Sequence, residues 1–149
     1  RMRFLASDSS VFFQAEGGIP SSSTSRGLGG VYKGKLLGAS ELPDIGHFFP
    51  DSDVRFDGAC SLELLKQVSR HITKQNYLIG NIDSTVIAEK PKISEYIEAM
   101  KAIMSAALNI SKNQINIKAT TNEKLGDIGR GKGIAALASV ILFRREYNE

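Results

Sequence analysis

The sequence predicts an α+β fold in which helices cover one face of a small sheet. Apolar residues recur at helical spacing in residues 61–74 and 91–107, whereas β-branched residues gather in residues 77–88, 115–119 and 134–143. The second half of the chain therefore runs in the order strand, helix, strand, turn, strand, which is typical of helices packed as a layer on a sheet.

Both predicted helices follow from their apolar stripes. Ser61 is expected to cap the first, whose apolar face continues to about Lys74. Pro91 is expected to open the second, whose stripe is predicted to be core rather than a cofactor site. Residues 36–39 are predicted to end an earlier helix. The stripe of the second helix consists of Ile93, Ile97, Met100, Met104 and Ala107.

The final apolar run, residues 134–143, fits either a helix or a strand. Its β-branched members Ile134, Val140 and Ile141 favour a strand, as do the glycines that precede it.

Length and composition restrict the class of protein. A chain of 149 residues fits one domain with a real core, and 42% hydrophobic with 23% charged residues is ordinary for a globular protein. A net charge of +3 without a long basic run permits an anionic ligand but does not indicate nucleic acid binding. No run approaches the roughly 18 apolar residues of a membrane span. Cys60 is the single cysteine, so an intrachain disulfide is excluded, and we expect it to be buried or half-buried.

Residues 1–34 differ from the rest of the chain. They are rich in serine and glycine and show no sustained period. We therefore predict an unpatterned leader, either disordered or of a targeting type, with room for one short strand near residues 11–13. The folded domain is predicted to comprise residues 35–149.

A polar turn in residues 118–130 is the most informative segment. It directly follows a predicted strand and contains two hydroxyls, an acid, an arginine and turn glycines. Backbone N–H groups and an arginine can bind phosphate oxygens, and a carboxylate can hold a bridging divalent metal. From these residues alone, a plain polar turn on a solvated edge is the favoured interpretation.

Two further segments change that interpretation. Residues 44–53 and 88–94, together with the turn, resemble in order and spacing the 2-C-methyl-D-erythritol 2,4-cyclodiphosphate synthase family. The resemblance extends from about Leu36 to Phe143 and includes residues 80–83, Gly-Asn-Ile-Asp. It implies a homotrimer of α+β subunits with active sites between neighbouring subunits. It also implies a phosphorus–oxygen lyase of the non-mevalonate pathway of isoprene (terpenoid) biosynthesis, which cyclises a CDP-linked methylerythritol 2-phosphate and releases CMP.

The resemblance also implies roles for particular residues. The erythritol part of the substrate would contact Asp44, Ile45 and Gly46. A flexible loop beside it would comprise Phe49, Pro50, Asp51, Ser52 and Asp53, with Ser52 where threonine is usual. Cytosine would be held mainly through the backbone of Ala88, Glu89, Lys90, Pro91, Lys92, Ile93 and Ser94, with Lys92 near phosphate. The diphosphate would be bound by Thr120, Thr121, Asn122, Glu123 and Arg130. Among these, Thr121 would be catalytic and Glu123 would bind magnesium or manganese.

The sequence departs from the family at its zinc site. Members carry an Asp-x-His near their start and a His-Ser-Asp-Gly-Asp segment followed by another histidine, and three of these residues ligate zinc. Here residues 8–10 are Asp-Ser-Ser, and the two histidines stand elsewhere. We expect His47 to be an exposed loop residue and His71 a surface or boundary residue. The family's zinc ligands are therefore missing, which would impair turnover. Asp127 stands where an aromatic residue is usual.

Two alternatives to the enzyme remain at this point. One is a non-catalytic trimeric module that binds CDP, CMP or a prenyl diphosphate, and the other is a plain anion-binding domain. The resemblance implies no nucleic acid or membrane partner. It places a bacterial member in the cytoplasm, whereas the serine-rich leader is compatible with a plastid or apicoplast in a eukaryote.

Overall fold

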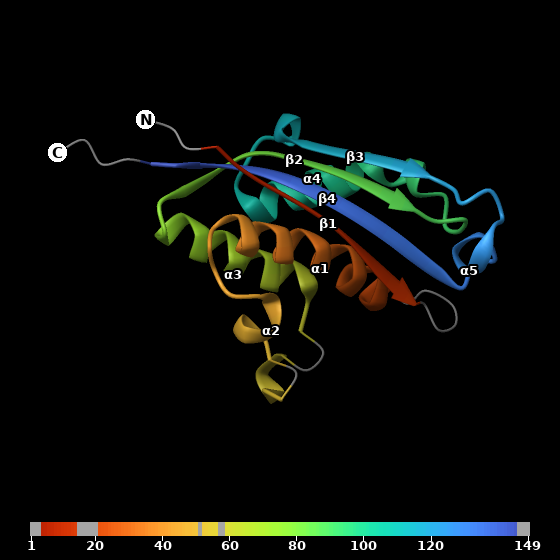
Figure 1. Cartoon of the computed structure of the whole chain (residues 1–149), viewed down its shortest axis with the longest axis horizontal. Helices are drawn as coiled ribbons and strands as arrows, with labels where there is room; N and C mark the ends of the chain where they lie inside the picture. Colours follow the sequence, from red (N-terminus) through yellow and green to blue (C-terminus); the bar gives the residue numbers. More distant parts are fainter. Residues whose placement is uncertain (1–3, 15–20, 51, 57–58, 146–149) are drawn as a thin grey trace.

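The computed structural model describes residues 4–14, 21–50, 52–56 and 59–145, and within them a four-stranded sheet carries a layer of helices on one face (Figure 1). The predicted α+β class is confirmed. The elements in chain order are β1 (Phe4–Gln14), α1 (Ser21–Ala39), α2 (Ile45–Phe48), α3 (Ser61–Lys74), β2 (Tyr77–Ile87), α4 (Ile97–Leu108), β3 (Ile115–Thr120), α5 (Gly126–Gly129) and β4 (Gly133–Arg144), with 3-10 turns at Val54–Phe56, Ile93–Glu95 and Lys112–Gln114.

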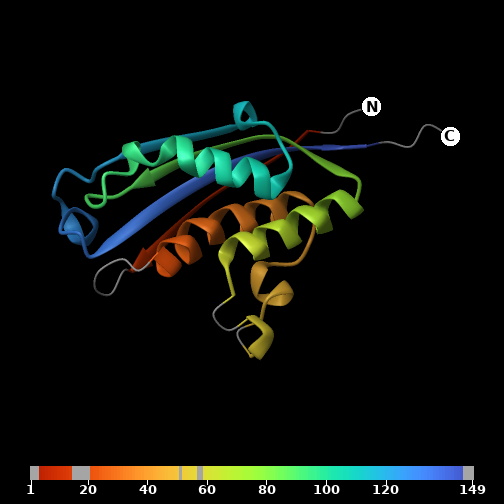
Figure 2. The ribbon, with the colours of Figure 1, turned by 180° about the vertical axis from the view of Figure 1, so that it is seen from behind.

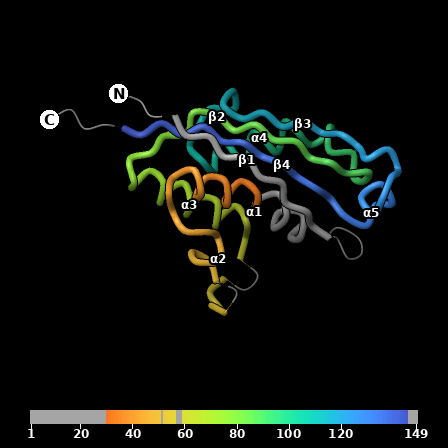
Figure 3. The backbone as a smooth tube through the Cα atoms, in the orientation of Figure 1, coloured from red at the N-terminus to blue at the C-terminus, as the bar shows by residue number. Residues whose placement is uncertain are grey.

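The strand order β1-β4-β2-β3 places the last strand of the chain inside the sheet. β4 pairs antiparallel with β1 and with β2, whereas β2 and β3 are parallel and are connected through α4. Figure 3 shows β2 and β3 running side by side toward the same end of the sheet. Their carboxyl ends, Ile87 and Thr120, are direct partners in the register, so the segments that follow them start at one edge.

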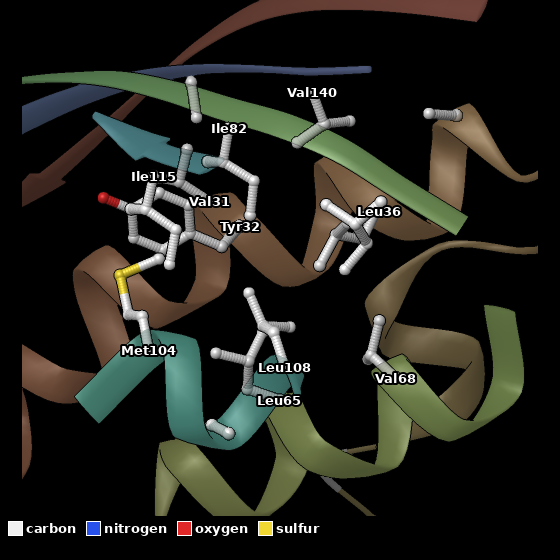
Figure 4. Close-up of a cluster of buried hydrophobic side chains, with 14 of the residues drawn as sticks. Val31, Tyr32, Leu36, Leu65, Val68, Ile82, Met104, Leu108, Ile115 and Val140 are labelled. Atoms are coloured by element: carbon white, nitrogen blue, oxygen red, sulfur yellow. The ribbon is translucent and has the colours of Figure 1, made fainter. Parts of the chain in front are cut away.

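The core lies between the sheet and the helices α1, α3 and α4, which are seen from behind in Figure 2. Alternate residues of β2, β3 and β4 point into this layer because successive side chains of a strand face opposite ways. Figure 4 shows side chains of the three helices meeting those of the sheet. The largest fully buried side chains are Leu36, Leu37, Leu65, Ile72, Ile82, Ile115, Leu142, Val68, Val86 and Val140.

A buried hydrogen bond fixes α1 against the sheet. The Tyr32 hydroxyl lies 2.8 Å from Ser84 Oγ, and Ser84 Oγ also donates to the carbonyl of Asn116 at 3.2 Å. Burial raises the pKa of Tyr32, so its hydroxyl stays protonated at physiological pH. α1, β2 and β3 are therefore tied together by polar contacts inside an apolar layer.

Several predictions made from local pattern are confirmed. Residues 61–74 form α3, the strands at 77–87 and 115–120 are present, and the ambiguous final run is strand β4. The earlier helix does end at Ala39. The alternation in β4 buries Ala136, Ala138, Val140 and Leu142, which explains why a strand wins over a helix there.

Three local predictions are wrong. The N-cap of α3 is Cys60 rather than Ser61, because the buried Ser61 hydroxyl instead accepts a hydrogen bond from Lys33 Nζ at 2.8 Å. Cys60 is exposed. Pro91 does not open a helix: it follows a cis peptide bond, and α4 begins only at Ile97, after a 3-10 turn.

The segment predicted as a leader contributes regular structure. β1 pairs with β4 over its whole length, from Phe4 opposite Phe143 to Gln14 opposite Gly133, and α1 begins at Ser21. Strand pairing is made by backbone groups, so a segment without side-chain period can still join a sheet. The boundary at residue 34 stays a prediction. In the described parts of the chain, no helix combines the length and the apolar character that crossing a membrane requires.

Candidate functional site

Two polar segments leave the sheet together at the carboxyl ends of β2 and β3. Residues 88–94 follow β2, and residues 121–131 follow β3 and include α5. The Ala88 N–H donates to the Thr120 carbonyl at 3.0 Å, which extends the parallel ladder one step beyond β2. We call these two segments, which sequence analysis assigned to cytosine and to diphosphate, the strand-edge loops.

The Glu89 side chain joins the strand-edge loops. Its Oε1 accepts hydrogen bonds from the backbone N–H of Asn122 at 3.2 Å and of Lys124 at 2.8 Å. Sequence analysis gave Glu89 a backbone role only, so this function of its carboxylate was missed. The acid directly after a strand was the available signal, but the sequence does not show which backbone groups it would reach.

The turn after β3 presents the predicted catalytic and metal-binding side chains to solvent. Thr121 Oγ1 donates to Glu123 Oε1 at 2.7 Å and accepts a longer hydrogen bond, 3.4 Å, from the Glu123 N–H. Both residues are exposed. The backbone is left-handed at Glu123 and Lys124, with φ of 50° and 63°, a conformation that residues other than glycine adopt infrequently. The hydroxyl and the carboxylate are thereby held next to each other.

Residues 126–131 close this turn. A Cβ added to Gly129 would lie 2.6 Å from the Cα of Lys124, so only glycine allows this approach. Arg130 donates to Asp127 Oδ1 at 2.6 Å, and both side chains are largely exposed. The hydrogen bond from Arg130 lowers the pKa of Asp127, with help from the charges of Arg130 and Lys132. The residue that replaces the usual aromatic side chain thus binds the predicted phosphate ligand Arg130.

The third predicted segment, residues 44–53, lies elsewhere. It forms α2 and its flanks, which project from the helix layer well away from α5 (Figures 1 and 3). Asp44 Oδ1 caps α2 by accepting from the His47 N–H at 2.9 Å, and the Phe48 ring lies 4.8 Å from the ring of His71 on α3. Within one chain the structure therefore does not bring the predicted erythritol loop to the strand-edge loops.

Local contacts hold that loop in place. Phe49 is buried against Phe56, with ring centroids 5.3 Å apart. The Asp53 carboxylate accepts from the Arg55 guanidinium and backbone, and the side-chain hydrogen bond is the main cause that lowers the pKa of Asp53. Of the remaining predicted residues, Ile45 and Pro50 are half-buried and Gly46 and Ser52 are exposed, while Asp51 lies outside the described residues.

The segment predicted to hold cytosine, residues 88–94, contains both buried and exposed residues. Ala88 and Ile93 are buried, which fixes both ends of the segment on the core. Lys92 is exposed and lies 3.7 Å from Glu95 in a loose ion pair. The predictions for the histidines agree with their positions, since His47 is exposed and His71 is half-buried. The other residues of the segment, Lys90 and Ser94, are exposed, and Pro91 is half-buried.

The side chains that could bind a metal at this site fit one magnesium or manganese ion better than a zinc ion. Across the described ranges there is no group of three or more His, Cys, Asp or Glu side chains placed to hold a metal, so the residues present do not fit the family's zinc site. The exposed carboxylate of Glu123 does fit magnesium or manganese, because such ions commonly use one or two carboxylates together with substrate phosphates.

Comparison with known proteins gives one consistent answer. The model of the YgbB family matches residues 34–143. The 2-C-methyl-D-erythritol 2,4-cyclodiphosphate synthase of Alkaliphilus oremlandii is 52% identical over 111 residues, which are 73% of this chain and 71% of that enzyme.

Solved structures agree in fold. The bifunctional IspDF of Campylobacter jejuni has a TM-score of 0.84 at 29% identity, and the match covers 98% of this chain but 44% of that longer one. IspF of Plasmodium falciparum in its CDP complex has a TM-score of 0.79 at 29% identity, with 96% of this chain and 97% of that one covered.

Proposed function

Because the chain belongs to the YgbB family, we propose that it is a lyase that converts a CDP-linked methylerythritol 2-phosphate into a cyclic diphosphate and releases CMP. The reaction belongs to the non-mevalonate route of isoprenoid synthesis. The observation that carries the proposal is the pair of strand-edge loops, where a cytosine-type segment and a phosphate-type turn are joined at one edge of the sheet. The similar P. falciparum protein was solved with CDP.

The chemistry requires positioning more than covalent participation by the protein. An oxygen of the 2-phosphate attacks the β-phosphorus of the same molecule. The bond from that phosphorus to the oxygen bridging it to the α-phosphate breaks, and CMP leaves with the electron pair. The protein then has to hold the two phosphates in line and to neutralise charge that builds up on their oxygens.

The residues of the turn suit those tasks. In the structure Thr121 Oγ1 donates its proton to Glu123 Oε1; with a cation bound at that carboxylate, the same proton would turn to a phosphate oxygen as charge develops on it. Thr120 and Asn122 would add neutral hydrogen bonds, and Arg130 and Lys92 would add charge-assisted ones. Thr120, Thr121 and Arg130 are exposed, so a substrate can reach them without rearrangement of the core.

Glu123 would hold a magnesium or manganese ion against the diphosphate. The ion, when bound, supplies charge neutralisation at the phosphate oxygens. Zinc is not included in the mechanism, because the described residues offer no matching ligand group.

We further propose that the working unit is a homotrimer. Residues 44–46 and 49–53 are suited to the erythritol part, yet in one chain α2 lies well apart from α5 and the strand-edge loops (Figure 1). A neighbouring copy can supply the missing half of each site. The sheet face opposite the helices supports this assembly, because it exposes Leu137 and keeps Ile141 and Phe143 only half-buried.

The test is CMP release from the CDP-linked substrate by the purified protein in the presence of magnesium, with light scattering on the same sample. We expect turnover and three times the chain mass of 16.2 kDa. CDP binding without turnover would favour the non-catalytic module instead. A monomer that still turns over would contradict the shared site.

A further inference from the structure

The Glu89 carboxylate lies in the concave backbone of the turn after β3, where an anionic ligand would otherwise be expected to bind. The N–H groups of Asn122 and Lys124 converge on one oxygen, Glu89 Oε1, while the residue between them is left-handed. Backbone N–H groups that converge in a turn form a concave site for an anion. The anion here is a carboxylate of the protein, supplied by the cytosine segment.

This contact corrects part of the phosphate hypothesis. The N–H of Glu123 donates to Thr121 Oγ1, so three consecutive N–H groups of the turn, at residues 122–124, already have protein acceptors. The diphosphate is then left to side chains and to a bound cation. The position of the Glu123 carboxylate consequently depends on what holds residues 122 and 124 on either side of it.

We propose that Glu89 is the positioning residue that sets Glu123 for metal binding and couples the cytosine segment to the phosphate turn. The inference rests on the proposed function and deepens it. Glu89 does not itself touch the reacting atoms: it fixes the N–H groups on both sides of Glu123 and so holds the left-handed backbone that aims the carboxylate. A segment that binds cytosine through its backbone thereby shares one hydrogen-bonded unit with the metal-binding turn.

Glu89→Ala and Glu89→Gln test this role as a pair. Alanine removes the acceptor, whereas glutamine keeps an acceptor oxygen on a side chain of the same length. For Glu89→Ala we expect the magnesium concentration for half-maximal activity to rise about 10-fold, as for other residues that orient metal ligands. We also expect kcat to fall about 10-fold or more from misplacement of the carboxylate. Glu89→Gln should stay within about 3-fold of the unaltered protein in both respects, because neutral hydrogen bonds are weaker but present.

Binding of CDP without metal separates positioning from collapse of the loops. We expect its Kd in Glu89→Ala to change by less than about 2-fold, because cytosine is proposed to be held by the backbone of residues 88–94, which alanine retains. A loss of metal-free CDP binding as large as the loss in kcat would overturn the proposal, since it would indicate a general structural role. Unchanged magnesium dependence in Glu89→Ala, or Glu89→Gln as impaired as alanine, would overturn it too.

A matched control is Glu63→Ala, which removes another exposed carboxylate. Glu63 lies on α3 and its carboxylate pairs with Lys66 Nζ on the same helix at 2.6 Å, so the magnesium dependence of Glu63→Ala should equal that of the unaltered protein. If the unaltered protein releases no CMP, the proposed function fails and Mn²⁺ binding in the presence of CDP, followed by electron paramagnetic resonance, decides the role of Glu89. Weaker Mn²⁺ binding by Glu89→Ala would support positioning, and equal binding would reject it.

Discussion

The strand-edge loops and the loop at residues 44–53 carry the two halves of the candidate site, and they are built differently. The strand-edge loops are distant in sequence and are joined by hydrogen bonds from Asn122 and Lys124 to Glu89. The loop at residues 44–53, called the α2 loop below, is held by contacts between residues close in sequence, such as Asp44 with the N–H of His47 and Asp53 with Arg55. Strand pairing in the sheet therefore brings the strand-edge loops together, whereas the loop at residues 44–53 is held by contacts within itself.

That difference explains why the two halves of the candidate site lie apart within one chain. Parallel pairing of β2 and β3 forces the two strand-edge loops to start side by side, so no further element is needed to bring them together. No such constraint acts on α2, which contacts the helix layer and points away from α5 (Figure 1). A self-contained loop of this kind is suited to meet a neighbouring subunit.

The largest effect is expected for Glu123→Ala, which alters the half of the candidate site formed by the strand-edge loops. Loss of the proposed metal ligand should reduce the rate of CMP release about 10²- to 10³-fold, because metal stabilisation of phosphate charge is worth several kcal/mol. CDP binding without metal should persist. Assays over a range of magnesium concentrations measure the rate of CMP release, and calorimetry measures the binding of CDP. An unaltered magnesium profile would remove Glu123 from the site.

A substitution at Lys33, on α1 in the helix layer, is expected to stabilise the folded protein. Lys33 is buried, and desolvation lowers its pKa from 10.5 to about 8. Below pH 8 the folded protein therefore bears the cost of a buried charge, and between about pH 8 and 10.5 stability should rise with pH, since the unfolded chain binds more protons. Lys33→Met should add about 2 kcal/mol to the free energy of unfolding at pH 7, the cost of Lys33 burial reduced by the lost hydrogen bond to Ser61.

Urea unfolding at pH 7 and near pH 10.5 checks this prediction. The gain should be largest at pH 7 and should shrink as the pH rises to 10.5, where the lysine is neutral in the folded protein and half protonated in the unfolded chain. Lys66→Met removes a half-buried lysine whose charged end pairs with Glu63, and it is the control, with an expected change within about 0.5 kcal/mol. A gain that does not depend on pH would show that packing, rather than the buried charge, is responsible.

Mixed trimers test whether the two halves come from different subunits. Asp44→Asn keeps a good helix cap but removes the charge of the α2 loop, and Glu123→Ala disables the turn. Each variant alone should be nearly inactive. Random co-assembly should restore about one quarter of full activity, because each shared site then receives two intact halves about one time in four. No recovery in verified mixed trimers would place both halves of a site in one chain.

The smallest effect is expected for Asp127→Asn in the strand-edge half. Asp127 would compete with the substrate for the Arg130 guanidinium, which lies 2.6 Å from its carboxylate. Its removal should lower KM for the CDP-linked substrate about 2- to 3-fold, since exposed ion pairs are weak. Steady-state kinetics measure the change, with Glu98→Gln as a control on the outer side of α4. An increase in KM would instead make Asp127 a substrate ligand.

Local pattern sufficed for most of the fold. The stripe of α4 identifies a helix because side-chain period follows directly from helix geometry, and the β-branched residues of the final run favoured the strand that β4 forms. The same logic failed at β1, where no period is visible and pairing with β4 supplies the order through backbone groups. The predicted N-cap at Ser61 was also wrong, because the Ser61 hydroxyl accepts a hydrogen bond from Lys33 of α1 and does not cap its own helix, α3.

The sequence by itself determined the chemistry of this protein: the hydroxyl, carboxylate and guanidinium of the polar turn, and the family to which the three loops belong. These are properties of residue type and spacing along the chain. Only the tertiary structure decided which of them meet. Glu89 reaches the turn, and residues 44–53 do not, because parallel strand pairing and backbone hydrogen bonds act between residues more than thirty positions apart and leave no pattern in the sequence.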